Sequence, residues 1–171
     1  APEHAHASLA WLTTEVTGGA VLFSLHGWST TFLVGALHLL LFVDLLTGRA
    51  SWSHRWVWWS GLLMLVAGLG LGFTGSLLPW TQQAYWDAVV RFELISQTPL
   101  IGPALAALLR GGERIGVLTL TTYNARHVHA LSGLLLLALV GRLWAEQCGP
   151  TPPGRFQQHL AALGAAGLTL V

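Results

Sequence analysis

Long apolar stretches separated by short polar segments run along the chain, and this pattern predicts membrane-spanning helices. Three stretches qualify, over residues 19–46, 57–78 and 127–146. About 20 apolar residues cross the hydrocarbon layer of a bilayer, so each stretch is long enough to span it. The second contains no charged side chain, and the third carries Arg142 near its end. The predicted fold class is therefore all-α, a transmembrane helical bundle.

The segments between and beyond these stretches divide the rest of the chain. Residues 1–18 are mixed and polar and form an N-terminal segment on the outer face. Residues 79–126 are too long for a simple turn and contain two stretches, 82–94 and 103–110, that are typical of short helices at the membrane interface. Residues 150–171 are expected to form a linker and the start of a further membrane helix. Because an apolar run is still continuing at the last residue, we expect the sequence to be a fragment.

The charges in the short loops predict the orientation of the spans. The loop between the first two spans contains Arg49, His54 and Arg55 and no acidic residue, and basic loops lie on the cytoplasmic side. The N-terminal segment has two acidic residues and no arginine, which fits the outer face. We therefore expect an integral protein of a bacterial inner membrane, with the N-terminal end of this sequence outside.

The composition excludes several other classes of protein. Apolar residues make up 53% of the chain and charged residues 9%, whereas about a quarter of a soluble globular chain is charged. The same numbers exclude intrinsic disorder. A net charge of +1 lacks the basic surface that binds nucleic acid, so no nucleic-acid partner is expected. Cys148 is the only cysteine, which excludes an internal disulfide and a cysteine-ligated zinc site.

Histidines within the predicted spans are the candidate functional residues. His26 and His38 lie on the first span, and His127 and His129 open the third. A ring nitrogen in hydrocarbon needs a partner, which is either a cofactor or a carbonyl of a neighbouring helix. The first and third spans run in the same direction, so His26 and His127 both belong to the outer half of the membrane. Two histidines at one depth on two helices predict bis-histidine ligation of a haem iron between them.

No such pair of histidines is present for a second haem deeper in the membrane. The positions about 14 residues further on hold Leu40 on the first span and Gly141 or Arg142 on the third. His38 follows His26 by 12 residues, a rotation of about 120°, so it faces another side of the helix. Gly61 and Gly75, 14 residues apart, suit either a flat cofactor or close helix packing. The sequence therefore predicts one haem site and, deeper in the membrane, a second position that has lost its haem ligands.

Several short motifs follow one another along the chain. They are His26-Gly27-Trp28-Ser29, Leu46-Thr47-Gly48, the run Gly-Phe-Thr-Gly-Ser-Leu-Leu-Pro-Trp at residues 72–80, Pro99-Leu100-Ile101-Gly102-Pro103 and Leu108-Leu109-Arg110-Gly111-Gly112. Over about residues 20–149 the chain resembles the N-terminal, haem-binding half of the cytochrome b subunit of quinol-oxidising Rieske/cytochrome b complexes. It is nearest to the short plastid and cyanobacterial form of that subunit.

This resemblance implies a four-helix haem bundle over residues 19–149, with the first helix of the bundle missing from this chain. It places His26 and His127 at the ligands of the haem b near the outer face, Gly75 against that haem and Gly61 at its inner counterpart. It also implies that residues 79–126 border a site of quinol oxidation. The implied partners are membrane lipid, quinol, a Rieske iron–sulfur protein or another high-potential acceptor, and the C-terminal half of cytochrome b.

The chain departs from the family at the inner haem and at the haem propionates. Leu40 and Arg142 stand where the family has its two inner histidines. Phe23, Gly27 and Val43 stand where family members often carry basic residues near the propionates. Asp44 lies at a depth similar to that of Arg142, and we expect an ion pair between them, since either alone is an unpaired charge in the membrane. A quinone pocket on the cytoplasmic side is the alternative role for these two residues.

Three hypotheses follow from these residues. The leading one is a b-type cytochrome subunit, part of an oxidoreductase rather than a complete enzyme, that carries one haem b and passes electrons from quinol to a high-potential acceptor. The second is a haem-poor structural subunit derived from the same fold, in which His26 and His127 bond to protein groups. The third is a second, inner haem rescued by His38 with an unusual partner. The number of haems per chain distinguishes the three.

Overall fold

The computed structural model describes residues 4–51 and 54–148, and the regular structure within these ranges is helical. Three helices are long and apolar enough to cross a membrane. They are α2 (Gly19–Leu46), α3 (Arg55–Gly75) and a continuous helix made of α6 (Val117–Ala125), a π-helical turn (Arg126–Leu131) and α7 (Ser132–Cys148). The prediction of an all-α membrane bundle is confirmed. The linker and further helix predicted over residues 150–171 lie outside the described residues.

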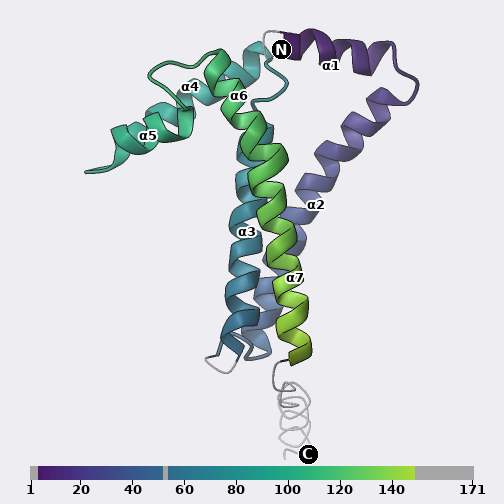
Figure 1. Cartoon of the computed structure of the whole chain (residues 1–171), viewed down its shortest axis with the longest axis vertical. Helices are drawn as coiled ribbons and strands as arrows, with labels where there is room; N and C mark the ends of the chain where they lie inside the picture. The colour runs from purple at the N-terminus through teal and green to yellow at the C-terminus, as the bar shows by residue number, and fades with distance from the viewer. Residues whose placement is uncertain (1–3, 52–53, 149–171) are drawn as a thin grey trace, which may run out of the picture.

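The bundle is closed at one end and open at the other. We call the end where residues 47–54 join α2 to α3 the loop end, and the opposite end, which carries the shorter helices, the surface-helix end. In Figure 1, α2 lies against α3 and α7 at the loop end and diverges from them toward the surface-helix end. The buried residues of α2 agree: Leu37, Leu41 and Asp44 are all in its second half, and only Gly19 is buried before them. Two cavities lie between α2, α3 and the third span where these helices diverge, and we call this region the wedge.

Small residues of α3 allow the long helices to approach one another. Leu37 of α2, Met64 of α3 and Ala138 of α7 form one buried apolar cluster, so α3 packs against both neighbours. A Cβ on Gly68 would lie 3.0 Å from the Leu37 side chain, and the neighbouring Ala67 is fully buried. Small residues at such contacts let helix backbones approach closely, and this increases the van der Waals packing that contributes to helix association in lipid.

The shorter helices α1 (Ala5–Thr14), α4 (Gln82–Ser96) and α5 (Gly102–Arg110) lie at the surface-helix end (Figure 1). The structure places α4 and α5 where the sequence predicts interfacial helices. The side chain of Thr81 caps α4 by accepting a hydrogen bond from the Ala84 amide at 3.1 Å. The sequence analysis missed α1, because this helix buries none of its residues and has no apolar face to reveal it.

A compact apolar core fixes these helices to the end of α3. Leu77, Ala84, Ala88, Phe92 and Tyr123 are buried together. Two arginines add polar links to this core. Arg91 donates to the Ser76 hydroxyl at 2.7 Å, and Arg126 donates to the Leu108 carbonyl at 2.8 Å near the C-terminus of α5. A cation at that position also opposes the negative end of the α5 helix dipole.

The third span differs from its prediction at its start. The sequence predicts that it begins at residue 127, whereas the helix is already under way at Val117 and passes through the π-helical turn before becoming α7. Thr119, Leu120 and Tyr123 are buried in α6, so packing against the core of the surface-helix end extends the helix. The sequence pattern missed this extension because α6 alternates threonine with apolar residues and lacks a continuous apolar run.

Candidate cofactor site

The two histidines predicted as ligands face each other across the wedge at the surface-helix end. The His26 ring on α2 and the His127 ring of the π-helical turn have centres 6.0 Å apart, with an angle of 78° between their planes. A metal–imidazole bond is about 2 Å long and the ring centre lies about 1 Å beyond the nitrogen, so two imidazoles on one metal have centres roughly 6 Å apart. The observed spacing leaves room for one metal ion between the rings, and it is also the spacing of an ordinary edge-to-face contact between two rings.

A hydroxyl on α3 holds the His127 ring in one tautomer. The Thr74 hydroxyl donates to the Gly70 carbonyl at 2.8 Å, because a carbonyl can only accept. Its oxygen therefore accepts from His127 Nδ1, 3.1 Å away. With the proton on Nδ1, the lone pair of Nε2 is available to a metal, and hydrogen bonds of this kind orient metal-binding histidines. The sequence analysis includes Thr74 in the motif at residues 72–80 but assigns it no role.

His26 has no comparable anchor. It is exposed, and its ring has no hydrogen-bond partner among residues 4–51 and 54–148. Its backbone carbonyl, in contrast, accepts hydrogen bonds from Ser29 Oγ at 2.8 Å and Thr30 Oγ1 at 3.0 Å. An imidazole without a partner in a membrane-spanning helix is costly, which makes it a functional candidate.

Two cavities, of about 230 and 170 Å³, flank the histidine pair. Both are lined by Phe23, His26, Gly75 and His127. The larger cavity continues along Gly27, Thr30, Thr31, Leu71, Gly72 and Ser76, and the smaller one along Leu9, Leu78 and Pro79. Apart from the two imidazoles, the shared walls are apolar or lack a side chain, which suits a flat apolar ring system better than a polar solute.

Gly75 provides the close approach between α3 and His127. A Cβ at this position would lie 2.8 Å from His127 Cε1, closer than real side chains allow. At Gly72, one turn earlier, a Cβ would meet only Thr30, at 4.0 Å. The structure therefore gives Gly75 two roles, as the space for the His127 ring and as part of the wall of both cavities. Phe73, between the two glycines, points into the core of the surface-helix end instead.

The π-helical turn sets the position of His127 on its helix. One extra residue per turn rotates the following helix by about 100° relative to a regular α-helix, and such turns occur frequently at functional sites. Ser132 stabilises the turn by donating to the His127 carbonyl at 2.6 Å. No periodicity in the sequence indicates this turn, so the sequence analysis did not anticipate it.

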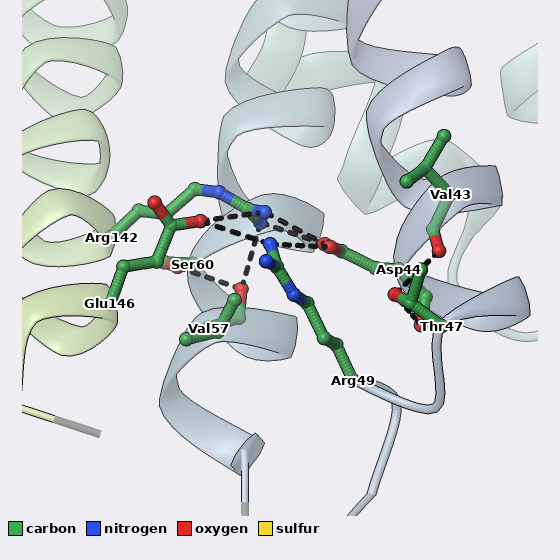
Figure 2. Close-up of polar contacts among 8 residues, drawn as sticks. All are labelled: Val43, Asp44, Thr47, Arg49, Val57, Ser60, Arg142 and Glu146. Carbon is green, nitrogen blue, oxygen red and sulfur yellow. Dashed lines mark hydrogen bonds and ion pairs between the residues drawn. The ribbon is translucent and has the colours of Figure 1, made fainter. Parts of the chain in front are cut away.

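A buried ion pair joins the same helices at the loop end (Figure 2). Arg142 donates to both oxygens of the Asp44 carboxylate, from Nη1 at 2.8 Å and from Nη2 at 3.0 Å. Asp44 is fully buried and Arg142 is 3% exposed. The predicted pairing is confirmed, and its bidentate geometry is the strongest arrangement open to these two groups.

Further partners complete the charge balance around this pair. Arg142 also donates to the Val57 carbonyl at 3.1 Å, and its Nη2 lies 3.1 Å from Glu146. Arg49, from the loop after α2, lies 3.5 Å from Glu146 and 3.7 Å from Asp44. Two cations and two anions thus form what we call the charge cluster: Asp44, Arg49, Arg142 and Glu146. The sequence analysis missed the contributions of Arg49 and Glu146.

Comparison with known proteins decides the family. The profile of Cytochrome b/b6/petB matches residues 2–145. The chain belongs to the cytochrome b/b6 family. Cytochrome b6 of Heliobacterium modesticaldum is 36% identical over 143 residues, which cover 81% of this chain and 65% of that protein. Cytochrome b6 of Prochlorococcus marinus (strain NATL1A) is 34% identical over 136 residues, which cover 80% and 62%.

Membership of the cytochrome b/b6 family confirms the resemblance found in the motifs. It makes this chain an integral membrane protein of a family of haem-containing electron-transport proteins, in agreement with its three apolar helices. The chain spans slightly less than two thirds of the length of the two cytochrome b6 relatives, 65% and 62%.

The two levels of this cytochrome b/b6 chain differ in how well they fit a haem. At the surface-helix end, two imidazoles at ligand spacing, an oriented Nδ1–H and a wall without a side chain at Gly75 suit haem ligation. At the loop end, the corresponding space is filled by the charge cluster. Neither arginine nor a paired aspartate is a haem ligand. The residues of the loop end therefore do not fit the group.

Three further histidines, His38, His54 and His129, lie apart from this site. His38 is exposed, and its Nδ1 lies 2.8 Å from the Val34 carbonyl of its own helix. Leu37, which precedes His38 in α2, packs against α3 instead. This bond occupies one nitrogen of His38 and lends no support to a role as an inner ligand. His129 is exposed on the π-helical turn, and His54 lies 3.3 Å from Ser51 in the loop.

Proposed function

We propose that this chain is the haem-carrying, N-terminal half of the cytochrome b subunit in a membrane complex that oxidises quinol. One haem b is held between His26 and His127. The observation that carries the proposal is the facing of these two imidazoles, with centres 6.0 Å apart, inside a wedge lined by apolar residues and Gly75. Family membership supports it, since the relatives are cytochromes.

Haem supplies one-electron transfer, and the protein supplies its ligands and its surroundings. His127 enters the site with Nδ1 protonated and hydrogen-bonded to Thr74, so its Nε2 is the free donor. His26 supplies the second donor from the opposite wall. The apolar residues around them, including Phe23 and Leu71, exclude water and lower the local dielectric constant. A low dielectric constant and neutral ligands are two of the levers by which a protein sets a haem potential.

The quinol and the electron acceptor belong to the surface-helix end. Residues 79–126, which form α4, α5 and α6, correspond to the segment that borders the quinol-oxidation site in the family resemblance. Arg91 of α4 donates to Ser76, and Ser76 lines the larger cavity, so this segment is in direct contact with the haem-binding wall. We propose a high-potential acceptor, such as a Rieske iron–sulfur protein, at this end, on the outer side of a bacterial inner membrane. The C-terminal half of cytochrome b completes the quinol site.

Single substitutions at the two histidines test the haem assignment. His26→Ala and His127→Ala are each expected to abolish the low-spin optical and electron paramagnetic resonance signals of the protein purified from membranes. His129→Ala is the matched control, because His129 lies on the same π-helical turn but is exposed and lines neither cavity. Retention of an unchanged low-spin spectrum in His127→Ala refutes the assignment.

A haem-poor structural subunit is the second candidate function. The observation that favours it is that the described residues lining the two cavities include no arginine, and Phe23 and Gly27 stand where partners for haem propionates are expected. In that case the purified chain contains no stoichiometric haem. The two histidine substitutions then leave the optical spectrum of the protein unchanged.

A further inference from the structure

The loop end repeats the architecture of the histidine site with different side chains. On α3, Gly61 precedes Gly75 by 14 positions, and on α7, Arg142 follows His127 by 15. At 1.5 Å per residue both steps correspond to about 21–23 Å along the helix axes. Because α3 and α7 run in opposite directions, the two steps lead to the same depth. The structure confirms the match, since each glycine lies against the residue expected at its level.

The contact distances are nearly the same at both levels. A Cβ on Gly75 would lie 2.8 Å from His127 Cε1, and a Cβ on Gly61 would lie 2.9 Å from Arg142 Nη1. A Cβ on Gly61 would also lie 2.9 Å from Leu41 and 3.7 Å from Asp44 Oδ2 on α2. Arg142 therefore lies against Gly61 at the loop end as His127 lies against Gly75 at the surface-helix end. Its partner on α2 is the carboxylate of Asp44 instead of an imidazole.

We infer that Arg142 and Asp44 are the residues that set the cofactor stoichiometry of this chain, because their ion pair closes the second of two equivalent cofactor positions. This inference rests on the proposed haem at His26 and His127. The pair joins α2 to α7 directly, and the bond from Arg142 to the Val57 carbonyl adds α3. All three long helices therefore meet at the level where a cofactor would otherwise separate them.

The closure restricts where electrons leave the protein. At the loop end Arg142 is paired with Asp44, and the haem site is about 21 Å away along the helix axes. Electron transfer falls steeply with distance, so this chain offers no route from the haem to the loop end. A haem bound at His26 and His127 would therefore exchange its electrons at the surface-helix end.

Reopening the second level tests this inference. The variant Leu40→His/Asp44→Leu/Arg142→His removes the ion pair and supplies one imidazole from α2 and one from α7. The remaining charges of the cluster, Arg49 and Glu146, still face each other at 3.5 Å. We expect the wild-type protein to contain one haem b per chain and this variant two, counted by pyridine haemochrome assay, with a second low-spin signal by electron paramagnetic resonance.

Two matched variants isolate the cause. Asp44→Leu/Arg142→Met removes the charges without adding ligands, and we expect it to keep one haem. Leu40→His alone adds a ligand but keeps the ion pair, and we also expect one haem. If the triple variant retains the low-spin signal of the haem at His26 and His127 but still contains one haem per chain, the inference is overturned. A wild-type protein that contains two haems per chain overturns it as well. A wild-type protein without haem instead refutes the proposed function.

If the triple variant loses the low-spin signal of the haem at His26 and His127, a second measurement replaces the haem count of this variant. Asp44→Ala/Arg142→Ala opens the same space with small side chains, and added imidazole supplies the missing ligands. Titration of this protein with haem in the presence of imidazole is expected to give a second equivalent of low-spin haem that the wild-type protein does not bind. Equal uptake by the two proteins overturns the inference.

Discussion

Asp44 and Arg142 are separated by 98 positions in the sequence and form a bidentate ion pair that is almost completely buried. The pair joins α2 to α7, and His26 lies nearer the surface-helix end of α2 while His127 lies in the π-helical turn that continues into α7. One pair of helices thus holds two imidazoles at one level and two opposite charges at the other. This contrast between the two levels leads to the predictions below.

Removing one partner of the ion pair is expected to destabilise the protein far more than removing both. Arg142→Met leaves the Asp44 carboxylate buried with only Arg49 nearby, at 3.7 Å. Breaking one side of a buried pair costs about 3–5 kcal/mol, whereas replacing both partners with apolar groups is often nearly neutral. Thermal unfolding in detergent measures the difference. Equal destabilisation by Arg142→Met and by Asp44→Leu/Arg142→Met contradicts this prediction.

Gly75 is expected to be essential for haem retention. A methyl group in Gly75→Ala would lie 2.8 Å from His127 Cε1, so the ring must move away from its ligand position. Gly72→Ala is the matched control, because its methyl group would meet only Thr30, at 4.0 Å. Haem content after purification is the measurement. We expect a several-fold loss in Gly75→Ala and none in Gly72→Ala, and equal haem content in the two variants contradicts the role of Gly75.

Thr74 is expected to act on the haem through His127. Thr74→Val keeps the shape of the side chain but removes the acceptor for Nδ1–H. Loss of such a supporting hydrogen bond typically lowers metal affinity about 10- to 100-fold. Haem dissociation measured by transfer to apomyoglobin reports this change. Thr74→Ser restores the hydroxyl and should restore slow dissociation, and a Thr74→Ser protein that behaves like Thr74→Val argues against the hydrogen bond.

The prediction from sequence succeeded where single residues or long patterns carry the information. The apolar runs gave the long helices, and the depth of His26 and His127 on parallel spans brought together two residues that meet at 6.0 Å. The same reasoning paired Asp44 with Arg142, since an isolated charge in the membrane must find a partner.

The features that sequence reasoning missed leave no mark in the pattern of apolar residues. α1 buries no residue, so no pattern marks it as a helix. The π-helical turn depends on local hydrogen bonding, including the bond from Ser132 to the His127 carbonyl, and leaves the composition unchanged. Thr74 acquires its role only because α3 packs beside His127. Arg49 joins the charge cluster only because the packing of α2 and α7 brings Asp44 and Glu146 within its reach.

Tyr123 offers a test of the core at the surface-helix end. Its hydroxyl is buried and has no hydrogen-bond partner among the described residues. Burying an unsatisfied polar group costs about 1–3 kcal/mol. Tyr123→Phe removes that group and keeps the ring contacts with Phe73 and Phe92, so we expect equal or higher thermal stability. A marked loss of stability shows instead that the hydroxyl has a partner in the assembled complex.

The number of haem b groups per chain in the wild-type protein tests the central claim most directly. The protein is purified from membranes with its natural partners, haem is measured by pyridine haemochrome assay, and the chain is counted by quantitative amino-acid analysis. We predict one haem per chain, lost in His26→Ala and His127→Ala and unaffected by His129→Ala. The absence of haem from the wild-type protein contradicts the proposed function, and two haems per chain contradict the closure of the loop end by Asp44 and Arg142.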